Sequence, residues 1–436
     1  LEVTKGQAMI KTAIRLWELK ERIYDKAKSE KEKRFWGLYV HICKVTTLYQ
    51  AYQDARANGG KPGMDGITFD WIEEYGVVKY LEEISSELKE KTYKPEPNRK
   101  VRIPKGDGKE RQLGIPNIKD RIVQGAVKQI LEPIFEADFC NCSYGYRPNK
   151  KAQEAVSNVG KEISGGKHLV IDVDLSGYFD NIRHHILFKK IARRVNDNDV
   201  MHLIKLICKA NGKKGVPQGG VISPLFSNIY LQEVDEMFTR AEAVVRRHYG
   251  TELTFYRYAD DMICMVKKRQ QYERLMKDVR RRLKQELEKL QVVMNEEKTK
   301  EVDMSKGETF SFLGFEFSWG KSRFGKKMMA YYEPKKKKVQ ALAEGIRQLL
   351  KKLWAMPIQG VIAALNQKLR GWVNYFRIGN SSRVFRKVRN IVINKLVWYM
   401  KRKRKNKFRW KKWSTKELFD KYGLYNDYQI RYYQKA

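Results

Sequence analysis

The sequence predicts an α+β fold that ends in a helical domain, and three observations lead to this prediction. Residues 255–266 form two short apolar, aromatic-rich runs around an acidic connection, which is typical of a β-hairpin with Asp260 and Asp261 at or beside its turn. Residues 167–174 form another short apolar run, which indicates a strand. From residue 334 onward, apolar residues recur at the spacing of amphipathic helices.

Charge and composition narrow the class of partner. The 436-residue chain carries 89 Lys and Arg against 51 Asp and Glu, a formal net charge of +38, which favours a polyanion over a membrane surface. No apolar run approaches the roughly 20 residues that span a bilayer, so we expect no membrane contact. The five cysteines show no Cys-x-x-Cys spacing, so we expect reduced intracellular thiols without zinc or disulfides. These features predict a nucleic-acid-binding protein.

The carboxylates near the two strands suggest metal-dependent chemistry. Strand alternation places Asp172 and Asp174 on one face and Ile171 and Val173 on the other. Beside the acidic hairpin, such carboxylates could share two divalent ions about 3.5–4 Å apart, a recurring clamp for displacement at phosphorus. An Asp-containing turn is also common for structural reasons, because Asp bonds its own backbone. The second acidic strand end favours nucleotidyl transfer.

The rest of the first 330 residues alternates helices with hairpins and loops. A basic hairpin is predicted over residues 99–116, where Lys105 and Arg111 either bind phosphate or lie on a solvated edge. A Gly/Pro loop over residues 215–224 either approaches a ligand or simply connects two elements. Helices are expected at 5–28, 34–57, 120–131, through 182 and 186, from 225, and at 270–290, with part of another hairpin at 310–317.

The C-terminal region contains three apolar stripes at helical spacing, which predict a three-helix bundle. In the following run, 401–412, nine of twelve residues are basic and aromatic residues are interleaved. A charge run is often a solvated face, but interleaved aromatic rings add stacking surfaces to phosphate contacts. We therefore expect nucleic acid contacts at Arg402, Arg404, Lys405, Lys407, Arg409 and Trp410.

Several short motifs occur in a characteristic order. They read VIDVD at 170–174, PQGG at 217–220 followed by SPL at 223–225, YADD at 258–261 and FLGF at 312–315. With SYGYRP at 143–148 and GWVNYFR at 371–377, the chain resembles bacterial group II intron reverse transcriptases, also called maturases, over about residues 35–410. One such motif alone is weak evidence, whereas this many in order are highly specific.

The resemblance implies a right-hand polymerase fold. N-terminal helices and fingers would occupy residues 1–165, an antiparallel-sheet palm 166–330, and a helical thumb, or maturase domain, 331–436. It implies an RNA-directed DNA polymerase that also binds group II intron RNA to assist splicing and retrohoming. The implied partners are an RNA template, a DNA primer, dNTPs and intron RNA, in the bacterial cytoplasm or at the nucleoid.

The resemblance also assigns metal-binding residues. Asp174 and Asp260 match the two aspartate ligands, Asp261 lies beside the second, and the backbone carbonyl of Leu175 matches a further ligand. Two Mg²⁺ ions, or Mn²⁺ in their place, are implied. Asp172 is then a neighbour of the metal-binding aspartate rather than its equivalent.

Other positions match residues around the substrates. Phe179, five residues after Asp174, resembles the steric gate that crowds a ribose 2′-hydroxyl. Lys298 resembles the lysine proposed to protonate pyrophosphate, although a structural surface lysine fits this position equally well. The remaining matches are Gln218 and Gly219 in the nucleotide pocket, Lys105 and Arg111 in the triphosphate clamp, and Leu313 and Gly314 in the primer grip.

Two other interpretations stay open. One is an RNA-binding splicing factor with little polymerase activity, against which the intact aspartates argue. The other is a free-standing reverse transcriptase of DNA repair or CRISPR spacer acquisition.

The segment 209–215 is shorter than in many relatives, so we expect a hairpin to be missing there.

Overall fold

The computed structural model describes residues 2–105, 109–269, 272–322, 325, 327–403 and 413–431. The chain divides into two compact units, which we describe separately. The first unit comprises Leu1–Asn149, Asp174–Val244 and Glu273–Lys298, and the second comprises Lys150–Val173, Val245–Tyr272 and Thr299–Ala436. Within the described ranges, no helix combines the length and the apolar character needed to cross a membrane.

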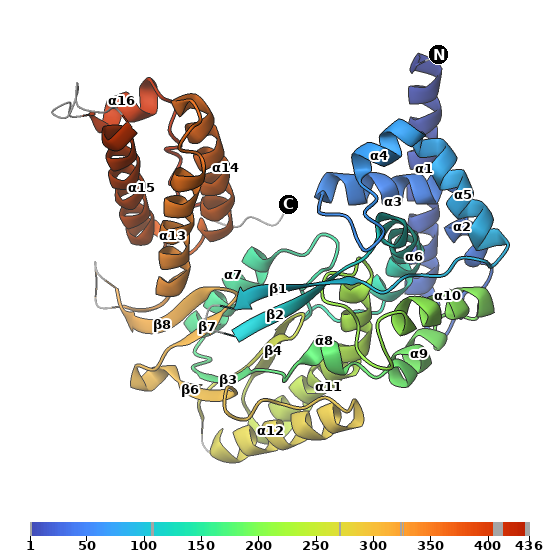
Figure 1. Ribbon diagram of the computed structural model, residues 1–436. Helices are drawn as coiled ribbons and strands as arrows, with labels where there is room; N and C mark the ends of the chain where they lie inside the picture. The colour runs from blue at the N-terminus through green and yellow to red at the C-terminus, as the bar shows by residue number, and fades with distance from the viewer. Residues whose placement is uncertain are drawn as a thin grey trace. The chain divides into compact units, whose positions relative to one another are not determined.

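Helix α6 (Ile118–Glu136) is the centre of the first unit. Most of its side chains are buried, and α1 (Glu2–Ser29) and α3 (Val45–Asn58) pack against it (Figure 1). The helices predicted at 5–28 and 120–131 are therefore confirmed. The remaining short helices of this region are α2 (Tyr39–Ile42), α4 (Phe69–Tyr75) and α5 (Val77–Lys89).

The helix predicted over residues 34–57 is wrong at its start, because the chain is extended there and two helices follow. Phe35 forms a parallel bridge with Val195, and two backbone hydrogen bonds of 2.7 Å join Phe35 to the neighbours of Val195. The Asp197 carboxylate accepts from two backbone N–H groups at the start of α2, at 2.8 and 3.1 Å. These bonds satisfy amides that a helix start leaves without partners, so α2 begins only after this contact.

Five further helices belong wholly or mainly to the first unit: α8 (Tyr178–Asn181), α9 (His184–Ala192), α10 (Asn198–Lys209), α11 (Ser223–Tyr249) and α12 (Tyr272–Lys289). The helix expected through residues 182 and 186 is interrupted between α8 and α9. There, the N–H groups of Gly215 and Val216 donate to the carbonyls of Ile182 and Phe179, both at 2.8 Å. The helices predicted from 225 and over 270–290 are confirmed as α11 and α12.

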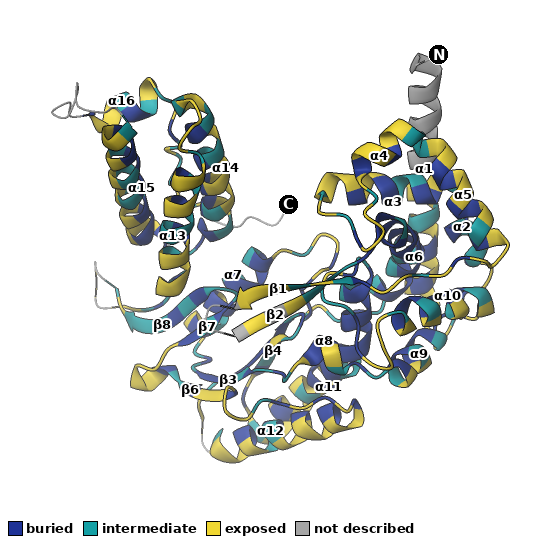
Figure 2. Ribbon diagram, in the orientation of Figure 1, coloured by how far each residue is buried: buried dark blue, intermediate teal, exposed yellow. Residues whose placement is uncertain are grey.

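The predicted basic hairpin is also confirmed. Strands β1 (Arg99–Lys105) and β2 (Lys109–Ile115) pair antiparallel, with Arg99 opposite Ile115 and Lys105 opposite Lys109. Much of this two-stranded sheet is exposed, as Figure 2 shows.

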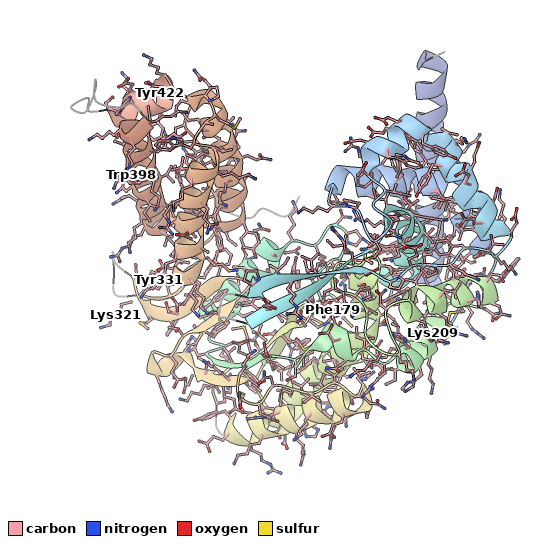
Figure 3. All side chains as sticks on the ribbon, in the orientation of Figure 1. Phe179, Lys209, Lys321, Tyr331, Trp398 and Tyr422 are labelled. Atoms are coloured by element: carbon pink, nitrogen blue, oxygen red, sulfur yellow. The ribbon has the colours of Figure 1, made fainter. Side chains whose placement is uncertain are left out.

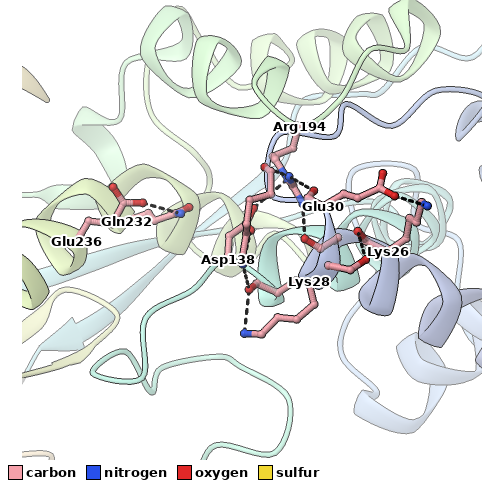
Figure 4. Close-up of polar contacts among 11 residues, drawn as sticks. Lys26, Lys28, Glu30, Asp138, Arg194, Gln232 and Glu236 are labelled. Carbon is pink, nitrogen blue, oxygen red and sulfur yellow. Dashed lines mark hydrogen bonds and ion pairs between the residues drawn. The ribbon is translucent and has the colours of Figure 1, made fainter.

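A buried arginine ties α1 to the segment after α6. Arg194 lies with Nε 3.0 Å from Oδ2 of Asp138, and its Nη2 donates to the carbonyl of Ala27 at 2.9 Å (Figure 4). Nη1 donates to the carbonyl of Glu30 at 3.0 Å, and Lys31 pairs with the other oxygen of Asp138 at 3.1 Å. One guanidinium therefore donates hydrogen bonds to carbonyls at the end of α1 and supplies a counter-charge to the largely buried Asp138 carboxylate.

The second unit is built on a four-stranded antiparallel sheet in the order β4-β5-β3-β6. Its strands are β3 (Leu169–Val173), β4 (Leu253–Tyr258), β5 (Asp261–Val266) and β6 (Lys300–Asp303). The inner strands β3 and β5 are buried along most of their length, which explains their nearly continuous apolar sequence. The acidic hairpin and the strand predicted within 167–174 are both confirmed.

A second antiparallel sheet follows, in the order β7-β8-β9. Its strands are β7 (Phe310–Phe312), β8 (Phe315–Lys321) and β9 (Met328–Pro334), so the hairpin expected at 310–317 is confirmed. Helix α7 (Ala152–Ser164) packs against β4, β8 and β9 and thereby contacts both sheets. At this contact, a Cβ atom on Gly160 would lie 2.6 Å from the Tyr332 ring, so only glycine allows this approach.

The C-terminal helices form the predicted bundle. They are α13 (Lys336–Lys352), α14 (Ile358–Phe376), α15 (Ser382–Lys403) and the short α16 (Thr415–Asp420) at one end (Figure 1). The three apolar stripes meet in one core, and members of this core include Leu342, Ile346, Leu365, Val388 and Leu396. Because these residues recur every three or four positions, each helix presents one continuous apolar face to the others.

We predict that Arg194→Ala lowers the free energy of unfolding by about 2–4 kcal/mol, because the largely buried Asp138 would keep only the half-exposed Lys31 as a partner and the carbonyls of Ala27 and Glu30 would lose their donor. Urea denaturation followed by circular dichroism measures this change. The matched control is Arg193→Ala, which removes an ion pair whose arginine is 61% exposed, leaves Glu233 paired with Lys190, and should cost no more than about 1 kcal/mol. Equal losses for the two variants would contradict the role assigned to Arg194.

Candidate functional site

The acidic turn between β4 and β5 is supported by a buried arginine. Tyr258 pairs with Asp261, which leaves Ala259 and Asp260 as a two-residue turn. Ala259 has φ +56°, a left-handed conformation that costs a non-glycine residue roughly 1–2 kcal/mol. Arg257 is completely buried, and its Nη1 donates to the carbonyl of Ala259 at 3.1 Å. This bond helps hold the turn that presents the two aspartates.

The register of β3 against β5 sets where the other acidic residues lie. Val173, the last residue of β3, pairs with Met262, the second residue of β5. The chain therefore leaves β3 at the end of the sheet that carries the acidic turn. Asp172 lies within β3 opposite Ile263, and Asp174 is the first residue after the strand.

A cavity of about 770 Å³ in the second unit borders this end of the sheet. Its acidic residues are Asp172 from β3 and Asp261 from β5. Its basic residues are Lys335 and Lys338 at the start of α13 and Lys368 on α14. The other lining residues are Ser311, Phe312, Leu313, Gly314, Ala341, Leu342, Trp372, Tyr375 and Phe376. Carboxylates and ammonium groups thus border one space, which suits a ligand that brings both phosphate and metal.

The β7–β8 turn in this cavity has an unusual backbone. Leu313 and Gly314 have φ of +50° and +83°, as in the type I′ turns that favour glycine or asparagine. A leucine in this conformation is strained, and such strain tends to occur at functional sites. The hydroxyl of Tyr375 donates to the Leu313 carbonyl at 2.9 Å, and the Lys335 N–H donates to the Gly314 carbonyl at 3.0 Å. Two contacts from the helical bundle therefore hold the turn.

The hydroxyl of Tyr375 stays a donor over the whole useful pH range. Burial raises the pKa of Tyr375 to about 12, and the nearby Tyr258 and Asp261 add to the shift. Since this pKa lies far above neutral pH, the bond to the Leu313 carbonyl does not titrate under ordinary assay conditions.

In the first unit, Lys298 lies beside Asp174. Leu175 forms an antiparallel bridge with Met294, and the Asn295 N–H donates to the Asp174 carbonyl at 2.8 Å. These contacts bring Lys298 Nζ to 3.7 Å from Asp174 Oδ2, with the side chains 54% and 42% exposed. An ion pair so exposed contributes little to stability, which weakens a purely structural explanation of this lysine.

The Gly/Pro loop contacts the basic hairpin, also within the first unit. The Gly114 N–H on β2 donates to the Gln218 carbonyl at 2.9 Å. Gly219 has φ +110°, and a Cβ atom there would lie 2.7 Å from the Gly114 carbonyl oxygen. Phe179 is buried on α8, and its carbonyl is held by the Val216 N–H of the same loop (Figure 3). The loop therefore joins β2 to α8.

Some predicted site residues lie outside what the structure describes. Lys105 and Arg111 lie on β1 and β2, but their side chains are not among the described atoms. Of the predicted nucleic acid contacts, Arg402 on α15 is described. The others fall outside the described residues: Arg404, Lys405, Lys407, Arg409 and Trp410.

Comparison with known proteins identifies the family. Residues 103–317 match the model described as reverse transcriptase (RNA-dependent DNA polymerase), and residues 339–419 match the group II intron, maturase-specific domain. Protein YkfC of Escherichia coli is 34% identical over 384 residues, which cover 79% of this chain and 98% of YkfC. The chain belongs to the group II intron reverse transcriptase and maturase family. It is accordingly an RNA-directed DNA polymerase.

Further relatives of this reverse transcriptase are intron-encoded. The group II intron-encoded protein LtrA of Lactococcus lactis subsp. cremoris is 33% identical over 244 residues, covering 54% of this chain and 40% of LtrA. The putative COX1/OXI3 intron 1 protein of Saccharomyces cerevisiae is 32% identical over 203 residues, covering 44% of this chain and 24% of that protein. The chain thus spans nearly all of YkfC but less than half of these two intron proteins.

The carboxylates fit the divalent ions typical of reverse transcriptases. Mg²⁺ is usually bound by one or two carboxylates together with substrate phosphates, rather than by a cage made only of protein. Accordingly, the described residues contain no ready group of three His, Cys, Asp or Glu side chains suited to a metal. Asp172 and Asp261 border one cavity, whereas the predicted ligands Asp174 and Asp260 are not among its lining residues but lie directly after β3 and directly before Asp261.

Several residues at this site of the reverse transcriptase were not predicted from sequence. Arg257 had a usable signal, because a lone cation within an apolar strand beside an acidic turn is unusual. Tyr375 lies inside the GWVNYFR motif, but nothing in the sequence indicates its bond to Leu313. Lys338 and Lys368 had no distinguishing signal in a chain with 89 basic residues.

We predict that Gly219→Ala lowers the free energy of unfolding by roughly 2–5 kcal/mol, from left-handed strain together with the clash at Gly114. Thermal denaturation measures the loss, and DNA synthesis should slow because the loop must move from β2. Gly66→Ala is the control, since Gly66 has φ +71° but no atom within 4 Å of the added Cβ. That variant should lose only the strain, roughly 1–2 kcal/mol.

Proposed function

We propose that the acidic turn, the end of β3 and the cavity beside them form the site of DNA synthesis on an RNA template. The observation that carries this proposal is the meeting of Asp172, Asp261 and the Leu313–Gly314 turn at one cavity that also contains three lysines. Reverse transcription needs these parts together, because the primer end must be gripped where nucleotide phosphates meet carboxylate-bound ions.

Asp174 and Asp260, with the Leu175 carbonyl, would hold two Mg²⁺ or Mn²⁺ ions, which when bound supply activation of the primer 3′-hydroxyl and neutralise the leaving pyrophosphate. The register supports this assignment, because Asp174 directly follows the strand that pairs next to the acidic turn. The bridge between Leu175 and Met294 is flanked by two hydrogen bonds, one accepted by the Asp174 carbonyl and one donated by the Ser176 N–H. Neither bond uses the Leu175 carbonyl, which fits its proposed role as a metal ligand.

The residues around the nucleotide have separate roles in this proposal. The buried ring of Phe179 would block a ribose 2′-hydroxyl and so favour dNTPs over ribonucleotides. Lys298 would donate a proton to the departing pyrophosphate, and its exposure allows a new proton from water. Gln218 and Gly219 would line the nucleotide pocket, while Lys105 and Arg111 on the basic hairpin would neutralise the triphosphate.

The primer would be held by the Leu313–Gly314 turn. Because Tyr375 and Lys335 fix both carbonyls of this turn, its position is set before the primer arrives. The ammonium groups of Lys335, Lys338 and Lys368 would then contact primer or template phosphates.

We propose a right-hand arrangement of these parts, with N-terminal helices and fingers over 1–165, palm over 166–330 and thumb over 331–436. The antiparallel acidic sheet supports the palm assignment, and the helical bundle supports the thumb. Group II intron RNA is the proposed second ligand, because the maturase-specific match at 339–419 covers this bundle. The basic run 401–412 would add to that contact.

Primer extension on an RNA template with Mg²⁺ and dNTPs tests the proposal. We predict that Asp260→Asn slows extension on the order of 100-fold or more, because a charged ligand is lost while the turn keeps its shape. Asp70→Asn, which changes an aspartate with an 81% exposed side chain on α4, should extend at the wild-type rate. If neither wild type nor Asp260→Asn extends the primer although both bind RNA, the chain is a splicing factor instead.

We also predict that Tyr375→Phe raises the KM for primer–template about threefold to tenfold while kcat changes less, because loss of one hydrogen bond of about 0.5–1.5 kcal/mol loosens the primer turn. Tyr331→Phe is the control. It removes a similar bond of 2.8 Å to the Lys321 carbonyl, between strands β9 and β8, and Figure 3 labels both residues. A matching KM rise in both variants would exclude a specific primer role for Tyr375.

A further inference from the structure

A second cavity of about 750 Å³ lies in the helical bundle, between α13 and α15. Its volume falls within the range of about 300–1,000 Å³ typical of small-molecule sites. It is lined by Arg347, Leu350, Lys351, Trp354, Asn394, Lys395, Trp398, Tyr399 and Arg402. None of these residues borders the cavity at the acidic turn.

Two exposed tryptophans dominate this α13–α15 groove. Trp354 is 45% exposed and Trp398 is 56% exposed, although large aromatic rings are normally well buried. Trp354 packs edge to face on the buried Tyr399, with ring centres 5.3 Å apart. The Tyr399 hydroxyl donates to the Leu353 carbonyl at 3.1 Å, so the base of the groove is fixed. Figure 3 labels Trp398 on α15, one helical turn from Arg402.

Positive charge surrounds these rings. Arg347 and Lys351 lie one turn apart on α13, and Lys395 and Arg402 lie on α15. The Arg402 guanidinium lies over the Trp398 ring, 4.3 Å from its centre. Glu344 forms an ion pair of 2.9 Å with Arg347 and offsets one charge, so four cations less one carboxylate give +3.

We propose that the α13–α15 groove binds an unpaired segment of single-stranded nucleic acid, one of whose bases stacks on Trp354 or Trp398. Every base has a flat aromatic face, and stacking on an exposed ring contributes roughly 1–3 kcal/mol per base. The surrounding Lys351, Lys395 and Arg402 suit the flanking phosphates, whereas an apolar protein partner would leave these cations without counter-charges.

The groove is distinct from the proposed polymerisation site. Lys338 borders the first cavity and Lys351 borders the groove, and these residues are thirteen positions apart on α13. At 1.5 Å per residue, this separation is roughly 20 Å along the helix. A base in the groove is therefore not the one being copied, and the groove holds a second segment of nucleic acid. The proposal refines the nucleic acid binding proposed above for the bundle, and rests on it, but does not depend on catalysis at the acidic turn.

The test measures binding of a labelled 12-nucleotide unstructured RNA by full-length protein whose primer–template site is already saturated with an unlabelled RNA–DNA duplex. The variant is Trp354→Ala/Trp398→Ala, and the control is Trp36→Ala, which removes a ring that is 76% exposed in the first unit. We expect the double variant to weaken binding about tenfold or more. The control should bind like wild type, and the double variant should still extend a pre-annealed primer at the wild-type rate.

An abasic oligonucleotide of equal length and charge separates stacking from charge. The double variant and wild type should bind it equally, because no base is present to stack. Equal losses for the base-containing and abasic strands, or no loss for either, would overturn the proposal. A parallel loss of primer extension would also overturn it, because the groove would then belong to the polymerisation site.

Two further arms complete the test. Trp398→Phe keeps an aromatic ring and should keep more of the affinity than Trp398→Ala, which gives an answer even if the double variant folds poorly. A matched single-stranded DNA identifies the source of the strand. Tighter binding of RNA indicates the intron or another RNA, and equal binding indicates that displaced DNA also enters the groove.

Discussion

The antiparallel pairing of β3 with β5 is the constraint on which the candidate site depends. Because Val173 pairs with Met262, the chain leaves β3 beside the acidic turn rather than at the opposite end of the sheet. A slip of one residue would turn every side chain of β3 to the other face and would bury Asp172 in the core. Burying an unpaired carboxylate is far more costly than exchanging one apolar residue for another, so Asp172 itself opposes such a slip and keeps the carboxylates in place.

Charge is distributed unevenly in this protein, and the distribution separates its tasks. The chain carries a net charge of +38, yet aspartates gather at the end of one sheet. A positive surface raises the local concentration of any nucleic acid, while the acidic end of the sheet repels phosphates unless divalent ions accompany them. The lysines of α13 and α14 border the same cavity. They attract the phosphates of an incoming strand, whereas the carboxylates on the other side accept phosphates only together with divalent ions.

The sequence predicted the elements that rest on strong periodicity or turn chemistry. The acidic hairpin, the basic hairpin, the helical bundle and the family were all predictable, because alternation, helical spacing and ordered motifs are local signals. The breaks at residues 34–38 and 182–183 were not predictable. The first comes from backbone hydrogen bonds between Phe35 and the residues on either side of Val195, and the second from hydrogen bonds donated by Gly215 and Val216. Tyr375 was missed for the same reason, since its hydrogen bond to a carbonyl 62 residues away leaves no pattern in the chain.

The two bonds that hold the Leu313–Gly314 turn have a mechanical consequence. They arise from α14 and from the residue that starts α13, so the turn is fastened to two helices of the bundle at adjacent carbonyls. The short turn also has little slack, because both of its residues are confined to one region of backbone space. A small rotation of α13 and α14 would therefore displace the turn by a similar amount. In the same way, a strand that displaces the turn would shift the two helices directly, without a separate mobile loop.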